Sequence, residues 1–282
     1  MTIRIYVITF LAVVGGICTA NAQETNEDFE TTPQLTMHSL MVGAGWSNVL
    51  DSYLSPYSYK GTNFTAMRET MRPTKLMEGK VYVQTLFQLD GSILDNRAKT
   101  AKEYAGGIRY GVNWQYNMKL AEGLQVMAGT GACGYLGGVY NDRNGNNPGQ
   151  AKVDLMIDLT AQALYQFRLL HRQWLLRYQV TAPFIGVAYS PNYGQSYYET
   201  FLLENYDRNV QFANFVNSPS MRHLLTLSVP TKNAVLRIGV SANYQQAKLN
   251  GLKYHSYNTD FILGFAKYFY RKTTNKNHVL PF

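Results

Sequence analysis

Cysteine and long apolar runs are both scarce in this sequence. Its 282 residues include two cysteines, and 16% of the residues are charged. After Ala22 no apolar run reaches the roughly 18 residues that a membrane-spanning helix needs, and the mean hydropathy is −0.23. No repeat of fixed period is present, which argues against a solenoid. These absences exclude a helical membrane protein.

The first 22 residues have the features of a cleaved secretory signal. Arg4 supplies a basic start, residues 5–14 are apolar, and residues 20–22 form an Ala-x-Ala ending. The apolar core is too short to span a bilayer comfortably, so we expect cleavage after residue 22. Because Cys18 leaves with the signal, the mature chain keeps Cys133 alone and cannot form an internal disulfide.

The charge balance fits an exported protein. The formal net charge is +8, and removal of Arg4 with the signal leaves about +7. An exported chain rarely meets nucleic acid, so we expect anionic lipid headgroups and lipopolysaccharide phosphates as counter-charges.

Residues 153–167, with the sequence VDLMIDLTAQALYQF, show what kind of fold the chain forms. Apolar side chains stand at the odd positions, and the even positions include Asp154 and Asp158. This period of two predicts a strand, which at about 3.3 Å per residue spans roughly 50 Å. One face can lie in hydrocarbon and the other in a polar lumen, as in a transmembrane β-barrel.

Similar segments predict an all-β fold, a single antiparallel transmembrane barrel of ten strands. The expected strands lie near residues 37–49, 62–72, 81–90, 108–118, 125–140, 153–167, 176–184, 224–229, 236–245 and 261–269. The pattern of the second strand does not tell which of its two faces points into the barrel. Glycines in the fifth predict bends or close approach of other groups in the lumen, and Pro183 in the seventh predicts a bulge. Twelve strands are the alternative, with residues 197–215 forming an extra hairpin.

The domain layout follows from these segments. We expect a signal peptide at residues 1–22, a flexible leader at 23–35, the barrel at 36–270 and a basic tail at 271–282. An even number of strands brings both ends to the periplasmic side, with short turns there and longer loops outside the cell. We therefore place the protein in the outer membrane of a Gram-negative cell.

Several stretches carry a family resemblance: GWSNVLDSYLSP at 45–56, RETMR at 68–72, NGNNP at 144–148, SPNYGQSYYE at 190–199 and NGLKYH at 250–255. Together they resemble a family of exported proteins from Bacteroides-like bacteria, catalogued as domain of unknown function 3316. The resemblance covers nearly the whole mature chain. It implies an exported outer-membrane protein, and it implies no activity, cofactor or catalytic residue.

Opposite charges are expected to meet inside the barrel. The predicted inward residues are Asp90, Arg109, Asp154, Asp158, Arg177, Arg237 and Asp260. Ten strands enclose little space beyond side chains. Paired charges would therefore plug the lumen. The alternative is a narrow pore for small polar solutes.

An outer-rim hydrolase, either a protease or a lipid-modifying enzyme, is a further hypothesis. Its candidates at the rim are Asp51, Asp207, His255 and Asp260. General-base chemistry needs such groups within hydrogen-bond reach, whereas loops are commonly polar without catalysing anything. We therefore favour a protein that is not an enzyme.

A calcium loop is suggested by Asp142, Asn144 and Asn146, but the pattern fails at two positions. Asn147 stands where glycine is required and Val153 where the bidentate glutamate is required. We therefore expect neither a metal site nor a cofactor.

Four tyrosines mark the longest connection, residues 190–219: Tyr193, Tyr197, Tyr198 and Tyr206. They suit either a lid packed over the barrel or a surface that stacks on sugars. We expect a structural or surface-binding barrel with an ordered loop cap. Its expected partners are outer-membrane lipid, lipopolysaccharide and the barrel-assembly machinery, with small polar solutes or surface glycans as ligands.

Overall fold

The computed structural model describes residues 35–145, 147–231 and 234–270. The predicted signal peptide, the basic tail and the leader up to residue 34 lie outside these residues, as does Asn146. No helix in the described ranges is long and apolar enough to cross a membrane.

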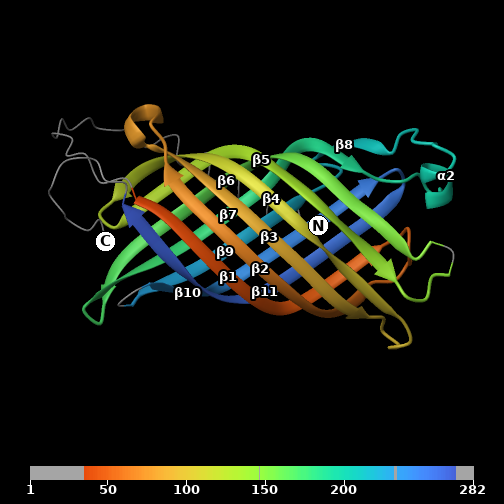
Figure 1. The fold of residues 1–282 in the computed structure, drawn as a ribbon, viewed down its shortest axis with the longest axis horizontal. Helices are drawn as coiled ribbons and strands as arrows, with labels where there is room; N and C mark the ends of the chain where they lie inside the picture. The colour runs from red at the N-terminus through yellow and green to blue at the C-terminus, as the bar shows by residue number, and fades with distance from the viewer. Residues whose placement is uncertain (1–34, 146, 232–233, 271–282) are drawn as a thin grey trace. The chain divides into compact units, whose positions relative to one another are not determined.

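Long strands make up nearly all of the described chain (Figure 1). The strands are β1 (Leu35–Asp51), β2 (Tyr59–Pro73), β3 (Val81–Asp95), β4 (Lys102–Ala121), β5 (Leu124–Asn141), β6 (Gly149–Leu169), β7 (Arg172–Tyr189), β8 (Val210–Asn214), β9 (Ser220–Pro230), β10 (Val235–Leu249) and β11 (Leu252–Tyr270). The described ranges also contain two short helices, η1 (Leu76–Gly79) and α2 (Tyr197–Phe201).

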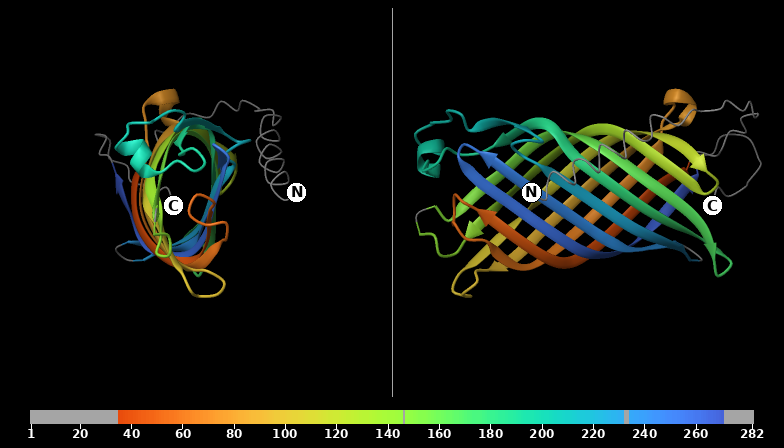
Figure 2. Two further views of the ribbon diagram at one scale, coloured as in Figure 1. Left: turned by 90° about the vertical axis from the view of Figure 1, so that its right-hand side faces the viewer. Right: turned by 180° about the vertical axis from the view of Figure 1, so that it is seen from behind.

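Antiparallel pairing closes the sheet into a barrel. β1 pairs with β11 along its whole length, from Leu35 opposite Tyr270 to Asp51 opposite Tyr254. With β6 also paired to β7, ten strands form a ring in the order β1-β2-β3-β4-β5-β6-β7-β9-β10-β11. The view along the barrel shows the closed ring (Figure 2). The predicted ten-stranded antiparallel barrel is confirmed.

The extra hairpin of the twelve-strand alternative does not form. Its first part is α2, where the hydroxyl of Ser196 accepts a hydrogen bond from the backbone N–H of Glu199 and caps the helix. Its last part is β8, which extends the wall beside β7, with Ile185 opposite Asn214 and Tyr189 opposite Val210. β8 therefore adds an eleventh strand to the sheet without entering the ring.

The two faces of β6 separate apolar from polar side chains. Leu155 and Ile157 are 60% and 50% exposed on the outside, whereas Asp158 and Thr160 are buried inside. The other strands repeat this pattern, with exposed aliphatic and aromatic residues outside. Lipid offers no hydrogen bonds, so a spanning sheet must be closed, as this one is. The protein is an outer-membrane β-barrel.

Two local features follow the sequence. The sequence pattern of β2 did not decide which face points inward. The structure shows that this face carries Met67, Glu69 and Met71, which are all buried. The bulge predicted at Pro183 is confirmed, because the register of β6 and β7 shifts between Ile157 and Asp158. On the other side of β7, β9 pairs with residues 175–181 and β8 with residues 185–189. Residues 182–184 lie between these segments and have no ladder partner there.

Connections of different length leave the two ends of the barrel. We call the end with the connections after β1, β3, β5, β7 and β10 the loop end, and the opposite end the turn end. The connections at the loop end are longer on average, as predicted. Residues 250–255 depart from the expected loop: Asn250 and Gly251 make a two-residue turn, with φ of 49° and 75°.

The glycines of β5 let the backbone of the neighbouring strand come close. A Cβ on Gly129 would lie 1.8 Å from the carbonyl oxygen of Trp114, whereas a Cβ on Gly91 of β3 would meet nothing within 4 Å. We expect Gly129→Ala to lower the free energy of unfolding by about 1–3 kcal/mol, measured by urea unfolding in detergent. Gly91→Ala is the control and should change it by less than about 0.5 kcal/mol. Equal stability of the two variants would contradict the close approach.

Candidate functional site

A buried carboxylate inside the barrel, nearer its turn end, binds two arginines. Glu69 Oε1 lies 2.6 Å from Arg177 Nη2, and Glu69 Oε2 lies 2.8 Å from Arg237 Nη1. All three side chains are at most 2% exposed. Glu69 stands on β2 and Arg177 on β7, five places apart around the ring of ten. The ion pair therefore joins opposite walls of the barrel.

Glutamines extend this contact into a closed circuit of hydrogen bonds. Gln84 Nε2 donates to Glu69 Oε1 at 2.6 Å, and Gln115 Nε2 donates to Gln84 Oε1 at 2.6 Å. Gln162 Nε2 donates to Gln115 Oε1, and Arg177 Nε donates to Gln162 Oε1, both at 2.6 Å. Five strands thus share one buried polar layer, which we call the Glu69 network.

A second charged layer lies beside Cys133. The guanidinium of Arg222 binds the carboxylate of Asp158, and its Nη1 donates to Cys133 Sγ at 3.2 Å. Asp90 accepts hydrogen bonds from Gln88 and Thr65.

Asp260 accepts two hydrogen bonds from the Asn63 amide, at 2.9 and 2.8 Å. Neutral donors thus satisfy both Asp90 and Asp260. Within the described ranges, no two of the seven predicted lumen residues lie within 4.0 Å of each other as an ion pair.

The sequence did not identify Glu69 or Arg222, the acid and the base that complete these ion pairs. Glu69 was visible on one face of the second strand, but the alternation did not tell which face pointed inward. Arg222 stood just before the segment 224–229 and was not assigned to a strand. A full count of inward positions on β9 would have found it.

Arg109 and Asp154 differ from the other lumen charges. Arg109 stacks on the ring of Tyr135, with its Cζ 4.6 Å from the ring centroid. Its Nη1 lies 3.8 Å from Cys133 Sγ, while its Nε and Nη2 are buried without a hydrogen-bond partner in the described part of the chain. Asp154 lines the same region and has neither an ion pair nor a side-chain hydrogen bond among the described residues.

A further ion pair lies inside the barrel at the loop end. Lys152 Nζ lies 2.8 Å from Asp51 Oδ2 and 4.1 Å from the centroid of the Tyr254 ring. Asp51 is 1% exposed. An apolar cluster that includes Val49 and Leu94 packs beside this pair.

The loops at this end contact one another. The hydroxyl of Tyr53 donates to the Gln195 carbonyl at 2.8 Å, and the hydroxyl of Tyr197 accepts from the Ala151 N–H at 2.5 Å. The Asn144 amide donates to the carbonyl of Leu54 at 2.8 Å. Burial raises the pKa of both Tyr53 and Tyr197 above the ordinary value, which favours their neutral, hydrogen-bonding forms.

The four predicted loop tyrosines divide into two groups. Tyr197 is partly buried and packs edge-on against Tyr53, with ring centroids 6.1 Å apart. Tyr193, Tyr198 and Tyr206 are 80%, 61% and 56% exposed. One of the four thus holds the loops together, and three present their rings to the outside.

The four rim candidates for hydrolysis lie in different surroundings. Asp51 points inward to Lys152, and Asp260 points inward to Asn63. His255 stands on the outer face, stacked on Tyr257 with ring centroids 4.6 Å apart. Asp207 is exposed on the loop that precedes β8. In the described ranges no three His, Cys, Asp or Glu residues gather where they could hold a metal ion.

Comparison with solved structures finds other barrels. The outer membrane protease OmpT from Escherichia coli is 11% identical, with a TM-score of 0.47 and coverage of 88% of this chain and 100% of that one. The translocator domain of the autotransporter NalP from Neisseria meningitidis is 12% identical, with a TM-score of 0.40 and 94% of each chain covered.

A major outer membrane protein from Thermus thermophilus is 11% identical, with a TM-score of 0.35 and coverage of 83% of this chain and 99% of that one. A search of curated proteins finds no match. The model of one protein family, described as a protein of unknown function (DUF3316), matches residues 5–276. Since this match covers nearly the whole chain, the protein belongs to the DUF3316 family.

Proposed function

We propose that this protein is a non-conducting barrel that presents an ordered cap of loops at the cell surface. The carrying observation is the Glu69 network, in which side chains from opposite walls meet inside the barrel. A ten-stranded barrel leaves little room around such a layer. The network then acts as a plug, and the role of the protein lies in structure and in surface binding.

The charges support this proposal over the narrow pore. An ion that crosses the lumen would have to displace Arg177 or Arg237 from Glu69, to which both are bound within 2.8 Å. Breaking a buried ion pair by removing one partner costs about 3–5 kcal/mol, because the other charge stays buried. A pore for small polar solutes needs a path that avoids this cost.

Conductance tests the plug directly. We expect the purified barrel to be silent in a planar lipid bilayer, because side chains fill the lumen at Glu69. Steady currents through the native protein would contradict the proposal. A variant with Glu69→Ala, Arg177→Ala and Arg237→Ala removes the three charges together and should give measurable channels.

Stability tests the same layer by a second route. We expect Glu69→Gln to lower the free energy of unfolding by about 3–5 kcal/mol, because two buried guanidinium groups lose their carboxylate. Urea unfolding followed by tryptophan fluorescence measures it. Glu78→Gln, on exposed η1 at the turn end, is the control and should change stability by less than about 0.5 kcal/mol. A similar result for both variants would remove the plug as a source of stability.

Surface binding is assigned to the three exposed loop tyrosines. An aromatic ring with a hydroxyl suits a sugar, and an aromatic contact contributes about 0.5–1.5 kcal/mol. If the cap binds surface glycans, each change to alanine at Tyr193, Tyr198 or Tyr206 should weaken binding to an oligosaccharide array by about two- to tenfold. Tyr57→Ala, an exposed tyrosine on the β1–β2 loop, should leave binding unchanged. No binding by the native protein would contradict the glycan role.

A further inference from the structure

Two lysines stand directly opposite each other at the loop end of the wall. Lys248 on β10 pairs with Lys253 on β11, at the second position from the turn that joins the two strands. Both side chains are exposed, whereas Leu249 and Leu252, the pair next to the turn, are buried. The lysines and the leucines therefore lie on opposite faces of the wall.

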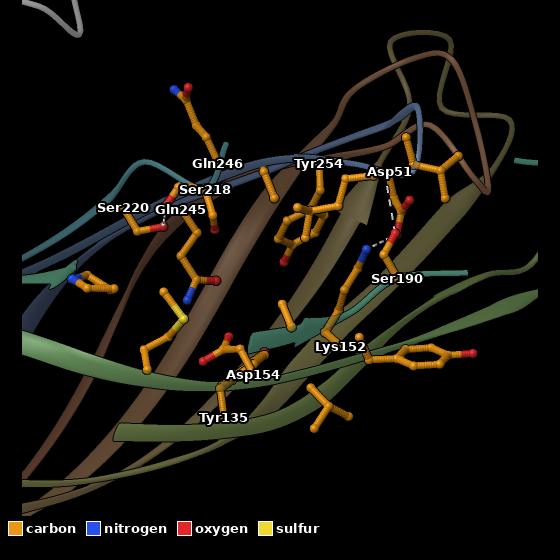
Figure 3. A pocket seen from close by; sticks show the side chains of 18 of the residues that line it. Asp51, Tyr135, Lys152, Asp154, Ser190, Ser218, Ser220, Gln245, Gln246 and Tyr254 are labelled. Carbon is orange, nitrogen blue, oxygen red and sulfur yellow. Dashed lines mark hydrogen bonds and ion pairs between the residues drawn. The ribbon is translucent and has the colours of Figure 1, made fainter. Parts of the chain in front are cut away.

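Strand alternation places both lysines on the outer face. Figure 3 shows Gln245 and Tyr254 turned into the barrel, with Gln246 turned the opposite way. Successive side chains of a strand point to opposite faces. Lys248 lies two residues after Gln246, and Lys253 lies next to Tyr254, so both lysines point away from the lumen.

This lysine pair is unusual because like charges directly opposite each other destabilise a sheet. The hairpin of β3 and β4 avoids that cost at the same end of the barrel. There Asp95 stands opposite Lys102, and the two form an ion pair at 3.2 Å. In the described ranges neither Lys248 nor Lys253 forms an ion pair with an acid. An anion from outside the chain would supply the missing counter-charge.

Toward the turn end, the same face of β10 and β11 continues as a polar and aromatic belt. Tyr257 stacks on His255 with ring centroids 4.6 Å apart, and its hydroxyl accepts a hydrogen bond from the Gln246 amide. The hydroxyls of Tyr244 and Thr259 share a hydrogen bond at 3.1 Å. Tyrosine rings with their hydroxyls suit the level of the lipid headgroups, where one end of the side chain is apolar and the other is wet.

Beyond this belt the outer face of the two strands is apolar. Phe261, Leu263 and Phe265 of β11 are exposed, and so are Ile238 and Leu236 of β10, which pair with the last two of them. Positive charge, a polar belt and an apolar surface thus follow one another along a single pair of strands. A phosphorylated lipid has three parts of the same kind in the same order.

We propose that this face of β10 and β11 binds one phosphorylated glycolipid of the outer leaflet, with a phosphate held between Lys248 and Lys253. A phosphate carries negative charge on several acceptor oxygens, so one group can serve both ammonium groups. The sugar would lie against Gln246 and Tyr257, and the acyl chains would run toward Phe261. With the loop end outside the cell, lipopolysaccharide supplies such a lipid. The site depends neither on the plug nor on glycan binding by the cap.

Lipid titration of the native protein in detergent tests this site. The probes are phosphorylated lipid A, the same lipid without its phosphates, and phosphatidylglycerol, with bound lipid counted by native mass spectrometry. We expect one phosphorylated lipid A per barrel, bound about tenfold or more tightly than either other lipid. An equal concentration of inorganic phosphate should not displace it.

Each contrary result overturns a defined part of the proposal. Equal binding of the lipid without phosphates would overturn the role of the lysine pair. Phosphatidylglycerol binding as tightly as phosphorylated lipid A would overturn the glycolipid assignment. Displacement by inorganic phosphate would point to a simple ion site, and absence of bound lipid A would overturn the site as a whole.

Variants separate the charge from the fold. Lys248→Glu places opposite charges across the two strands, as Asp95 and Lys102 do, so it should resist urea in lipid-free detergent at least as well as the native protein. Its binding of lipid A should fall about tenfold or more, because an attractive charge becomes repulsive. Lys253→Arg keeps the charge and should retain binding. Lys267→Gln is the control, since Lys267 is exposed on the same strand at the turn end. Unchanged binding by Lys248→Glu, or an equal loss with Lys267→Gln, would overturn the assignment.

Discussion

Every backbone hydrogen bond in the wall of this protein has to be made within the wall, because the surrounding lipid offers none. Pairing of β1 with β11 over their full length meets this requirement where the two ends of the sheet come together. Residues 182–184 of β7 are an exception on one side, because β8 and β9 leave a gap in the ladder there. Pro183 has no N–H to satisfy there, and the rings of Phe184 and Phe215 pack across the gap at 5.6 Å. The irregular backbone is thus covered by aromatic surface.

Inside the barrel, buried polar side chains must likewise find their hydrogen-bond and ion-pair partners among one another. Glu69 meets two arginines and a glutamine, so its charge and its lone pairs are used. A layer of this kind is costly to disrupt, since removing one member leaves the others buried and unpaired. Arg109 is satisfied less fully, because its Nε and Nη2 have no hydrogen-bond partner in the described part of the chain.

The cap depends on the same strands as the lumen. Asp51 and Lys152 form an ion pair at the strand ends, and Tyr53 and Tyr197 make hydrogen bonds from there to the loops. Loops held by hydrogen bonds to strand ends can present a fixed surface. The exposed rings of Tyr193, Tyr198 and Tyr206 stand on this surface.

By itself the sequence determined the class of fold and the inward and outward faces of most strands, because alternation along one strand is a local property. It also located the bulge at Pro183, since proline carries its backbone constraint with it. The partners inside the lumen were decided by tertiary structure alone. Glu69 and Arg177 meet because closure and register bring β2 opposite β7, and neither closure nor register can be read from one strand. For the same reason only the fold shows that Arg222 on β9 binds Asp158 on β6.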